Sequence, residues 1–257
     1  MSRKFILSLS SGGSLGYAHI GVLKAFIESG IDILAVSGTS MGGIVSSLFA
    51  LGISPYDIED VFVSIMSNIS VFSSAVLSHI GVHVGPMAFL HSMLKGIKIG
   101  HSRIPLFVYA TDMYTRKPYL FQPEDDMFTA LRATSAIPGI FPPIKYKGMY
   151  LVDGGIALPL PSKNLMKYKT PDVVSVGIEV YGGTLMGIRR SRVSIMNAYS
   201  LIMSRHGRCR GRYLDYIISP NLRGYTNLMY GRVREIIERG YAAGISFLED
   251  IYRKGLL

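Results

Sequence analysis

Cysteine is almost absent from this sequence, since Cys209 is the only one among 257 residues. A disulfide framework is therefore excluded, and a cytoplasmic location is the default expectation. Long apolar runs are missing as well. The mean hydropathy of +0.32 is high, but the longest apolar stretches, 44–53 and 58–66, are interrupted by serine, glycine or charge. None approaches the ~20 apolar residues of a membrane-spanning helix, so a buried parallel sheet better explains the hydropathy.

Acidic residues are scarce. Their number is 17 against 27 lysines and arginines, which gives a net charge of +10 and favours anionic partners, either nucleic acid or a membrane surface. The basic N-terminus with its apolar residues 5–9 is too short for a signal peptide, and it leads directly into a glycine-rich turn. We interpret it as the first strand of a single domain that spans residues 1–257.

Strand and helix patterns alternate along the chain. We predict strands at 4–8, 31–35, 104–110, 117–122, 149–152, 172–180 and 213–219, and helices at 17–29, 44–51, 126–134 and 228–252, with a further helix from residue 54. The apolar stretch 68–100 indicates either a lid or acyl-chain channel, or a packed helical layer around a short helix at residues 87–94. The alternation predicts an α/β fold with three α/β/α layers and a mostly parallel central sheet.

The stretch Gly-Thr-Ser-Met-Gly at 38–42 stands between a predicted strand and a predicted helix. Gly-x-Ser-x-Gly in this context is the nucleophile-elbow pattern, in which glycines on both sides leave room for a serine on a tight, strained turn. Ser40 is therefore the candidate nucleophile. An ordinary glycine-rich turn is the alternative, because the motif also occurs by chance.

A second glycine-rich turn, Ser-Gly-Gly-Ser-Leu-Gly at 11–16, follows the first predicted strand. Such a turn at a helix N-terminus exposes backbone N–H groups to an anion. It lacks the Gly-Lys-Ser/Thr ending of a P-loop, and Ser11 occupies the first glycine position of a dinucleotide fingerprint. An oxyanion hole remains open as an interpretation. His19, in the next helix, is either a catalytic base or a histidine hydrogen-bonded within the fold.

Asp-Gly-Gly at 153–155 follows the predicted strand 149–152. Ligands of open parallel sheets bind outside the carboxyl ends of the strands. We expect Ser40 and Asp153 both to occupy such ends and to meet in one crevice. Taken alone, Asp153 is better explained as a turn-forming residue ahead of two glycines.

In this order, the turn at 11–16, the elbow at Ser40 and Asp153-Gly154-Gly155 resemble the patatin-like phospholipases, specifically bacterial and archaeal proteins related to the neuropathy-target-esterase catalytic domain. The stretches 110–112, 132–139 and, more weakly, 236–241 are also similar to that family. Three positions differ from the family pattern: Ser11 replaces a glycine, Leu15 a basic residue and Pro159 an asparagine.

The resemblance implies a serine lipid acyl hydrolase with a Ser-Asp dyad. Ser40 would be the nucleophile and Asp153 its general base, while backbone N–H groups around Gly12, Gly13 and Ser14 would form the oxyanion hole. The expected substrate is a lipid or another ester, and we expect neither a cofactor nor a metal ion. The chemistry is consistent, because a carboxylate in a dry site can take the serine proton.

A basic segment without any acidic residue spans 181–214. It suits peripheral docking on an anionic membrane, whereas nucleic-acid binding would call for stacking aromatics or a known motif. A solvated basic face is the third interpretation. The arginines that would contact the membrane are Arg189, Arg190, Arg192, Arg205, Arg208, Arg210 and Arg212.

Two rival functions remain at this point. A Ser-His-Asp esterase needs a histidine after the acid, and His206, inside the arginine cluster, is the only one that follows Asp153. A non-catalytic lipid-binding or regulatory protein on the same fold is the other.

Overall fold

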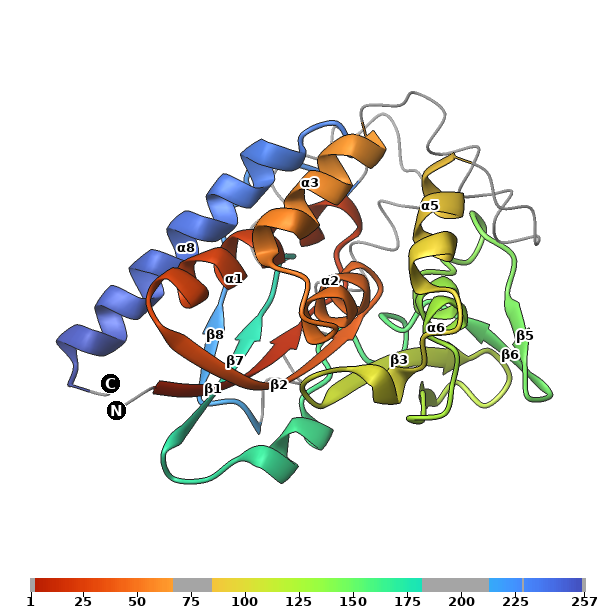
Figure 1. Cartoon of the computed structure of the whole chain (residues 1–257), viewed down its shortest axis with the longest axis horizontal. Coiled ribbons are helices and arrows are strands. Elements are labelled where there is room, and N and C mark those ends of the chain that lie inside the picture. Colours follow the sequence, from red (N-terminus) through yellow and green to blue (C-terminus); the bar gives the residue numbers. More distant parts are fainter. Residues whose placement is uncertain (1–2, 67–84, 182–212, 228, 256–257) are drawn as a thin grey trace.

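The computed structural model describes residues 3–66, 85–181, 213–227 and 229–255 (Figure 1). In this part of the chain an eight-stranded sheet has the order β5-β6-β3-β2-β1-β7-β8, with β4 paired to β3. The strands are β1 (Arg3–Leu9), β2 (Ile31–Thr39), β3 (Leu106–Asp112), β4 (Pro118–Leu120), β5 (Ile144–Tyr146), β6 (Met149–Val152), β7 (Val173–Ile178) and β8 (Tyr216–Ile218).

The sheet has a parallel half and an antiparallel edge. Strands β3, β2, β1, β7 and β8 run parallel to one another, whereas β4 and β6 pair antiparallel with β3, and β5 pairs antiparallel with β6. The prediction of an α/β fold with a mostly parallel sheet is therefore confirmed. Asp153 follows β6 as expected, but β6 belongs to the antiparallel edge and runs opposite to β3.

Helices cover one face of the sheet and pack on its main hydrophobic core (Figure 1). Alternate residues of β1 point to this core, including Phe5 and Leu7, as the two-residue period of a strand requires. The helices are α1 (Ala18–Glu28), α2 (Met41–Ala50), α3 (Pro55–Met66), α5 (Gly85–Leu94), α6 (Met127–Thr134) and α8 (Val233–Arg253). None of these described helices has the length and apolar character to cross a membrane.

The opposite face of β1 and β2 carries a smaller apolar cluster. Ile6 and Ala35 there contact Leu165 from the 3-10 helix η3 (Lys163–Tyr168). Of the predicted elements, the last helix begins at Val233 rather than at residue 228, because the preceding residues form turns. Strand β5 was not predicted. Most of the apolar stretch before α5 and nearly all of the basic segment, including His206 and Cys209, lie outside the described residues.

Candidate active site

Ser40 lies in the sharp turn between β2 and α2. Its φ of 53° is in the left-handed region, which is strained for a residue other than glycine. A Cβ on Gly38 would stand 2.3 Å from the carbonyl oxygen of Gly42, and a Cβ on Gly42 would stand 2.4 Å from the carbonyl oxygens of Leu9 and Ser10. Glycines are therefore required on both sides of Ser40, as expected for a nucleophile elbow.

Thr134, the last residue of α6, fixes the backbone of the elbow. Its hydroxyl accepts a hydrogen bond from the N–H of Ser40 at 2.8 Å and donates to the carbonyl oxygen of Tyr109 at 2.6 Å. Both groups are buried, so neither can turn to water for a replacement partner. Thr134 belongs to the family-like stretch 132–139, but the sequence predicted no role for it.

Asp153 meets Ser40 directly. The Ser40 hydroxyl donates to Oδ2 of Asp153 at 2.7 Å, and Oδ1 accepts from the N–H of Gly155 at 2.8 Å. The exposed fraction is 0% for Asp153 and 5% for Ser40. The two residues that the sequence selected as nucleophile and base thus form a buried, hydrogen-bonded pair.

Residues 153–157, which follow β6 and are called the Asp153 loop below, are held against the end of β3. Thr111 donates to the carbonyl oxygen of Asp153 at 2.8 Å and accepts from the N–H of Ala157 at 3.1 Å. Gly154 is essential to this approach, because a Cβ there would stand 2.1 Å from the carbonyl oxygen of Tyr109. Thr111, like Thr134, is a supporting residue that lay in a family-like stretch but had no predicted role.

The glycine-rich turn packs against both partners. A Cβ on Gly16 would meet the side chain of Met41, next to Ser40, at 2.5 Å. A Cβ on Gly155 would meet the hydroxyl of Ser11 at 2.7 Å, and this buried hydroxyl has no hydrogen-bond partner within the described residues. The turn therefore lies beside the serine and the aspartate.

The three predicted oxyanion residues differ in their hydrogen bonding. The N–H of Ser14 donates to the carbonyl oxygen of Asn227 at 3.2 Å. For the N–H groups of Gly12 and Gly13, the described part of the chain offers no acceptor. Gly13 has a φ of +53°, and a Cβ there would stand 2.6 Å from the same Asn227 oxygen. Gly12 and Gly13 therefore carry the donors that a ligand could use, whereas Ser14 is already engaged.

The side chain of His19 is completely buried. Its Nε2 lies 2.8 Å from the carbonyl oxygen of Ser10, and burial lowers the pKa of the imidazole to about 4. The ring is then neutral at physiological pH and donates to Ser10. This geometry matches the histidine hydrogen-bonded within the fold. Leu15 is likewise buried in the core, with an exposed fraction of 1%.

Two tyrosines near the carboxylate were not selected from the sequence. Burial raises the pKa of Tyr181, and the charge of Asp153 raises it further. Burial, followed by the same charge, raises the pKa of Tyr230 to about 12. Both phenols are therefore protonated at neutral pH. No sequence motif marks them, because they reach the site from the segment after β7 and from the segment before α8.

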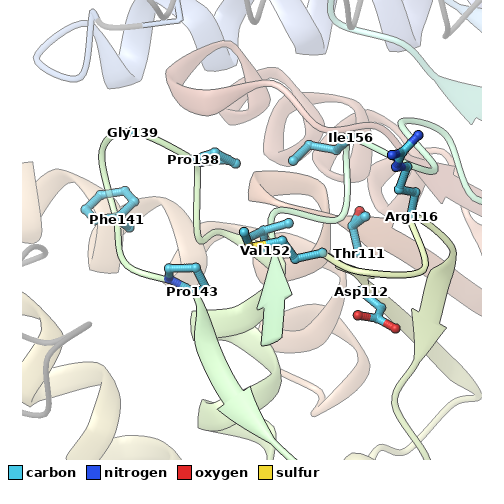
Figure 2. A pocket seen from close by; sticks show the side chains of 10 residues that line it. Thr111, Asp112, Arg116, Pro138, Gly139, Phe141, Pro143, Val152 and Ile156 are labelled. Atoms are coloured by element: carbon cyan, nitrogen blue, oxygen red, sulfur yellow. The ribbon is translucent and has the colours of Figure 1, made fainter. Parts of the chain in front are cut away.

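A cavity of about 370 Å³ adjoins the Asp153 loop (Figure 2). Val152 and Ile156, on either side of the loop, line it, but Ser40 and Asp153 do not. It is therefore a neighbouring space rather than the reaction centre itself. The other lining residues are Thr111, Asp112, Met113, Arg116, Pro138, Gly139, Phe141 and Pro143.

The described residues contain no cluster of three histidine, cysteine or acidic side chains placed to hold a metal ion. The prediction that no metal ion is needed stays a prediction.

Comparisons with known proteins identify relatives of the chain. An uncharacterised NTE family protein of Mycobacterium tuberculosis is 34% identical over 172 residues, which cover 62% of this chain and 45% of the relative. Lysophospholipase NTE1 of Kluyveromyces lactis is 24% identical over 288 residues, which cover 98% of this chain and 20% of the relative. The chain thus spans less than half the length of these relatives.

The fold has a solved counterpart. The crystal structure of VipD from Legionella pneumophila matches with a TM-score of 0.60 at 16% sequence identity and covers 97% of this chain and 67% of that one. The patatin-like phospholipase family model matches residues 7–165, a range that holds the glycine-rich turn, Ser40 and Asp153. Because this match spans more than half of the chain, the protein belongs to the patatin-like phospholipase family.

Proposed function

We propose that the protein is a serine lipid acyl hydrolase that cleaves carboxylic esters of phospholipids or lysophospholipids with Ser40 and Asp153 as its catalytic dyad. The observation that carries the proposal is the 2.7 Å hydrogen bond from the Ser40 hydroxyl to the Asp153 carboxylate. The bond joins a nucleophile on a strained elbow to a base in a buried site. Family membership and the lysophospholipase among the relatives support the lipid substrate.

The first half of the reaction forms an acyl-enzyme. Asp153 Oδ2 takes the hydroxyl proton as Ser40 Oγ attacks the ester carbonyl carbon. When the tetrahedral intermediate collapses, the C–O bond to the alcohol breaks, and Asp153 returns the proton to the departing alcohol oxygen. A water molecule then attacks the acyl carbon, again losing its proton to Asp153. Ser40 recovers a proton as the fatty acid leaves.

The oxyanion of each tetrahedral intermediate needs preorganised donors. The N–H groups of Gly12 and Gly13 are available for this role, and a single donor of this kind contributes about 3–4 kcal/mol in a well-studied protease. Ser14 would join them only if its N–H left the Asn227 carbonyl oxygen. We therefore assign the oxyanion hole mainly to Gly12 and Gly13, with Ser14 as a buttress of the turn.

Covalent labelling tests the assignment of the nucleophile. The wild type should react with a fluorophosphonate probe and hydrolyse a panel of phospholipids, lysophospholipids and short-chain esters, and Ser40→Ala should lose both activities. Ser29→Ala, at an exposed position after α1, is the matched control and should retain both. A folded wild type that neither reacts with the probe nor cleaves any ester would instead favour the non-catalytic lipid-binding protein.

The basic segment supports a second, finer proposal. We propose that its seven arginines dock a cytoplasmic protein on anionic membranes, each basic residue near the surface contributing about 1 kcal/mol. Binding to phosphatidylserine vesicles should exceed binding to phosphatidylcholine vesicles and weaken with salt. Replacing Arg205, Arg208, Arg210 and Arg212 by glutamine should remove this preference. Equal binding to both vesicles, or tighter binding to DNA, would contradict the proposal.

A further inference from the structure

The cavity beside the Asp153 loop has an apolar wall. Its carbon surface comes from the turn after β3, from the residues on either side of Asp153, and from the proline-rich loop after α6 (Figure 2). The residues that form this wall are Met113, Pro138, Phe141, Pro143, Val152 and Ile156. A volume of about 370 Å³ is at the small end of the range for ligand sites. Such a space suits one hydrocarbon chain rather than a whole two-chain lipid.

Two of the polar groups at the cavity are already satisfied. The Thr111 hydroxyl is bonded to the Asp153 carbonyl oxygen and the Ala157 N–H. The Asp112 carboxylate accepts from the Tyr114 N–H at 3.1 Å and the Thr115 hydroxyl at 2.7 Å. The hydrogen bond from Thr115 lowers the pKa of this carboxyl. The carboxylate therefore remains ionised and hydrogen-bonded within the turn.

Arg116 differs from these groups. It ends the same turn with a φ of 58°, and its N–H donates to the Asp112 carbonyl oxygen at 2.8 Å. Its side chain lines the cavity, and the described residues provide no ion-pair partner for its guanidinium. Such an exposed guanidinium beside an apolar wall can offer a carboxylate two parallel hydrogen bonds.

We propose that this cavity binds a single-chain fatty acid, with the hydrocarbon chain on the apolar wall and the carboxylate on Arg116. The inference rests on the proposed function for the choice of ligand, because a fatty acid is the acid that lipid ester cleavage releases. The cavity lies next to the reaction centre, since Val152 and Ile156 bracket Asp153 and the N–H of Ile156 donates to the Asp153 carbonyl oxygen at 3.3 Å. The site would hold the acid product beside the catalytic loop.

The test uses the full chain with Ser40→Ala, so that binding is measured without turnover. Decanoate is titrated below its micellar concentration by calorimetry, and decanol provides the same chain without the charge. Because the sequence contains no tryptophan, Phe141→Trp in the same background supplies a fluorescent reporter within the cavity. Decanoate should bind saturably, and the reporter emission should change over the same concentration range.

Arg116→Gln should weaken decanoate binding about tenfold or more, as expected for the loss of a charge-assisted pair, and leave decanol binding unchanged. Arg116→Lys should restore part of the affinity. Lys145→Gln, which removes an exposed cation of β5 that does not line the cavity, is the matched control and should bind decanoate like the parent.

Equal decanoate affinity with and without Arg116, or no saturable binding to a folded parent, would overturn the inference. Ester hydrolysis by the wild type is measured separately. Hydrolysis without decanoate binding therefore refutes this site alone, whereas decanoate binding without hydrolysis refutes the proposed function alone.

Discussion

The parallel half of the sheet and its antiparallel edge each supply one member of the buried pair. Ser40 follows β2, a nine-residue strand with parallel neighbours on both sides. Asp153 follows β6, a four-residue strand that runs opposite to β3. The half with long strands provides a rigid elbow, and the short edge carries the carboxylate to it.

The direction of β6 explains why the two residues meet. Val152 pairs with Thr111 and Leu151 with Asp112, so β6 starts beyond the carboxyl end of β3 and runs back toward the sheet. An antiparallel strand thereby delivers Asp153 to the same edge where parallel strands present their carboxyl ends. The site therefore lies where ligands of open parallel sheets bind, but Asp153 reaches it at the end of an antiparallel strand.

Removing the carboxylate should have the largest effect and shows whether the antiparallel edge is needed for chemistry. Asp153→Asn should lower kcat/KM for a short-chain ester by at least about 10³-fold, because the Ser40 proton then has no base. Steady-state kinetics checks this. Asp172→Asn, at an exposed position of the loop before β7, should retain full activity.

Histidine variants distinguish the dyad from a triad. His206→Ala should retain the activity that Asp153→Asn loses. The opposite pattern, with activity lost in His206→Ala and kept in Asp153→Asn, would show that the dyad is wrong.

At Gly154 the chain after the antiparallel edge contacts the parallel half of the sheet. A larger residue at this position should force the two regions apart. Gly154→Ala places a Cβ 2.1 Å from the Tyr109 carbonyl oxygen and 2.9 Å from Thr39, so backbone must move. We expect the free energy of unfolding to fall by about 3 kcal/mol or more, measured by denaturant titration. Gly231→Ala, where nothing lies within 4 Å, should change it by less than about 0.5 kcal/mol.

The parallel half could be predicted from sequence because its signals are local. Apolar strands, the glycines around Ser40 and the glycine cap after α1 follow from backbone sterics within a few residues. Strand β5 and the direction of β6 could not be predicted, since three- or four-residue strands carry little periodicity and their pairing depends on distant partners. Tyr181 and Tyr230 were missed because no local motif marks them and both lie far from Asp153 in the sequence.

The buried His19 of the parallel half should make folding sensitive to acid. Its pKa of about 4 in the fold lies below the ordinary value of 6.5, so the unfolded chain binds more protons between these two pH values. Stability is therefore complete above pH 6.5 and falls as the pH drops toward 4, by about 3 kcal/mol in total. Denaturant titrations at several pH values should show this slope in the wild type.

His19→Gln removes the titrating group and keeps a donor for the Ser10 carbonyl oxygen, so its stability should depend less steeply on pH in this window. The exposed His101→Gln is the matched control and should keep the wild-type slope. A slope that survives in His19→Gln would assign the acid sensitivity to other groups.

Thr134 and Thr111 allow the two regions to be compared with one chemical change. Thr134→Val removes the side-chain partner of the buried Ser40 N–H and Tyr109 carbonyl oxygen. Thr111→Val removes the side-chain partner of the Ala157 N–H and leaves the Asp153 carbonyl oxygen with the longer 3.3 Å hydrogen bond from the Ile156 N–H. Each should cost about 1–3 kcal/mol of stability. Each should also slow fluorophosphonate labelling of Ser40, by about tenfold, because either the nucleophile or its base loses its fixed position.

Serine at either position keeps the hydroxyl and should restore the labelling rate to within about twofold of the wild type. If the valine variants slow labelling equally, the elbow and the edge contribute equally to the geometry of the pair. If Thr134→Val slows it and Thr111→Val does not, the elbow alone sets the reactivity of Ser40. The Asp153 loop would then find its place without the hydrogen bonds that tie it to β3.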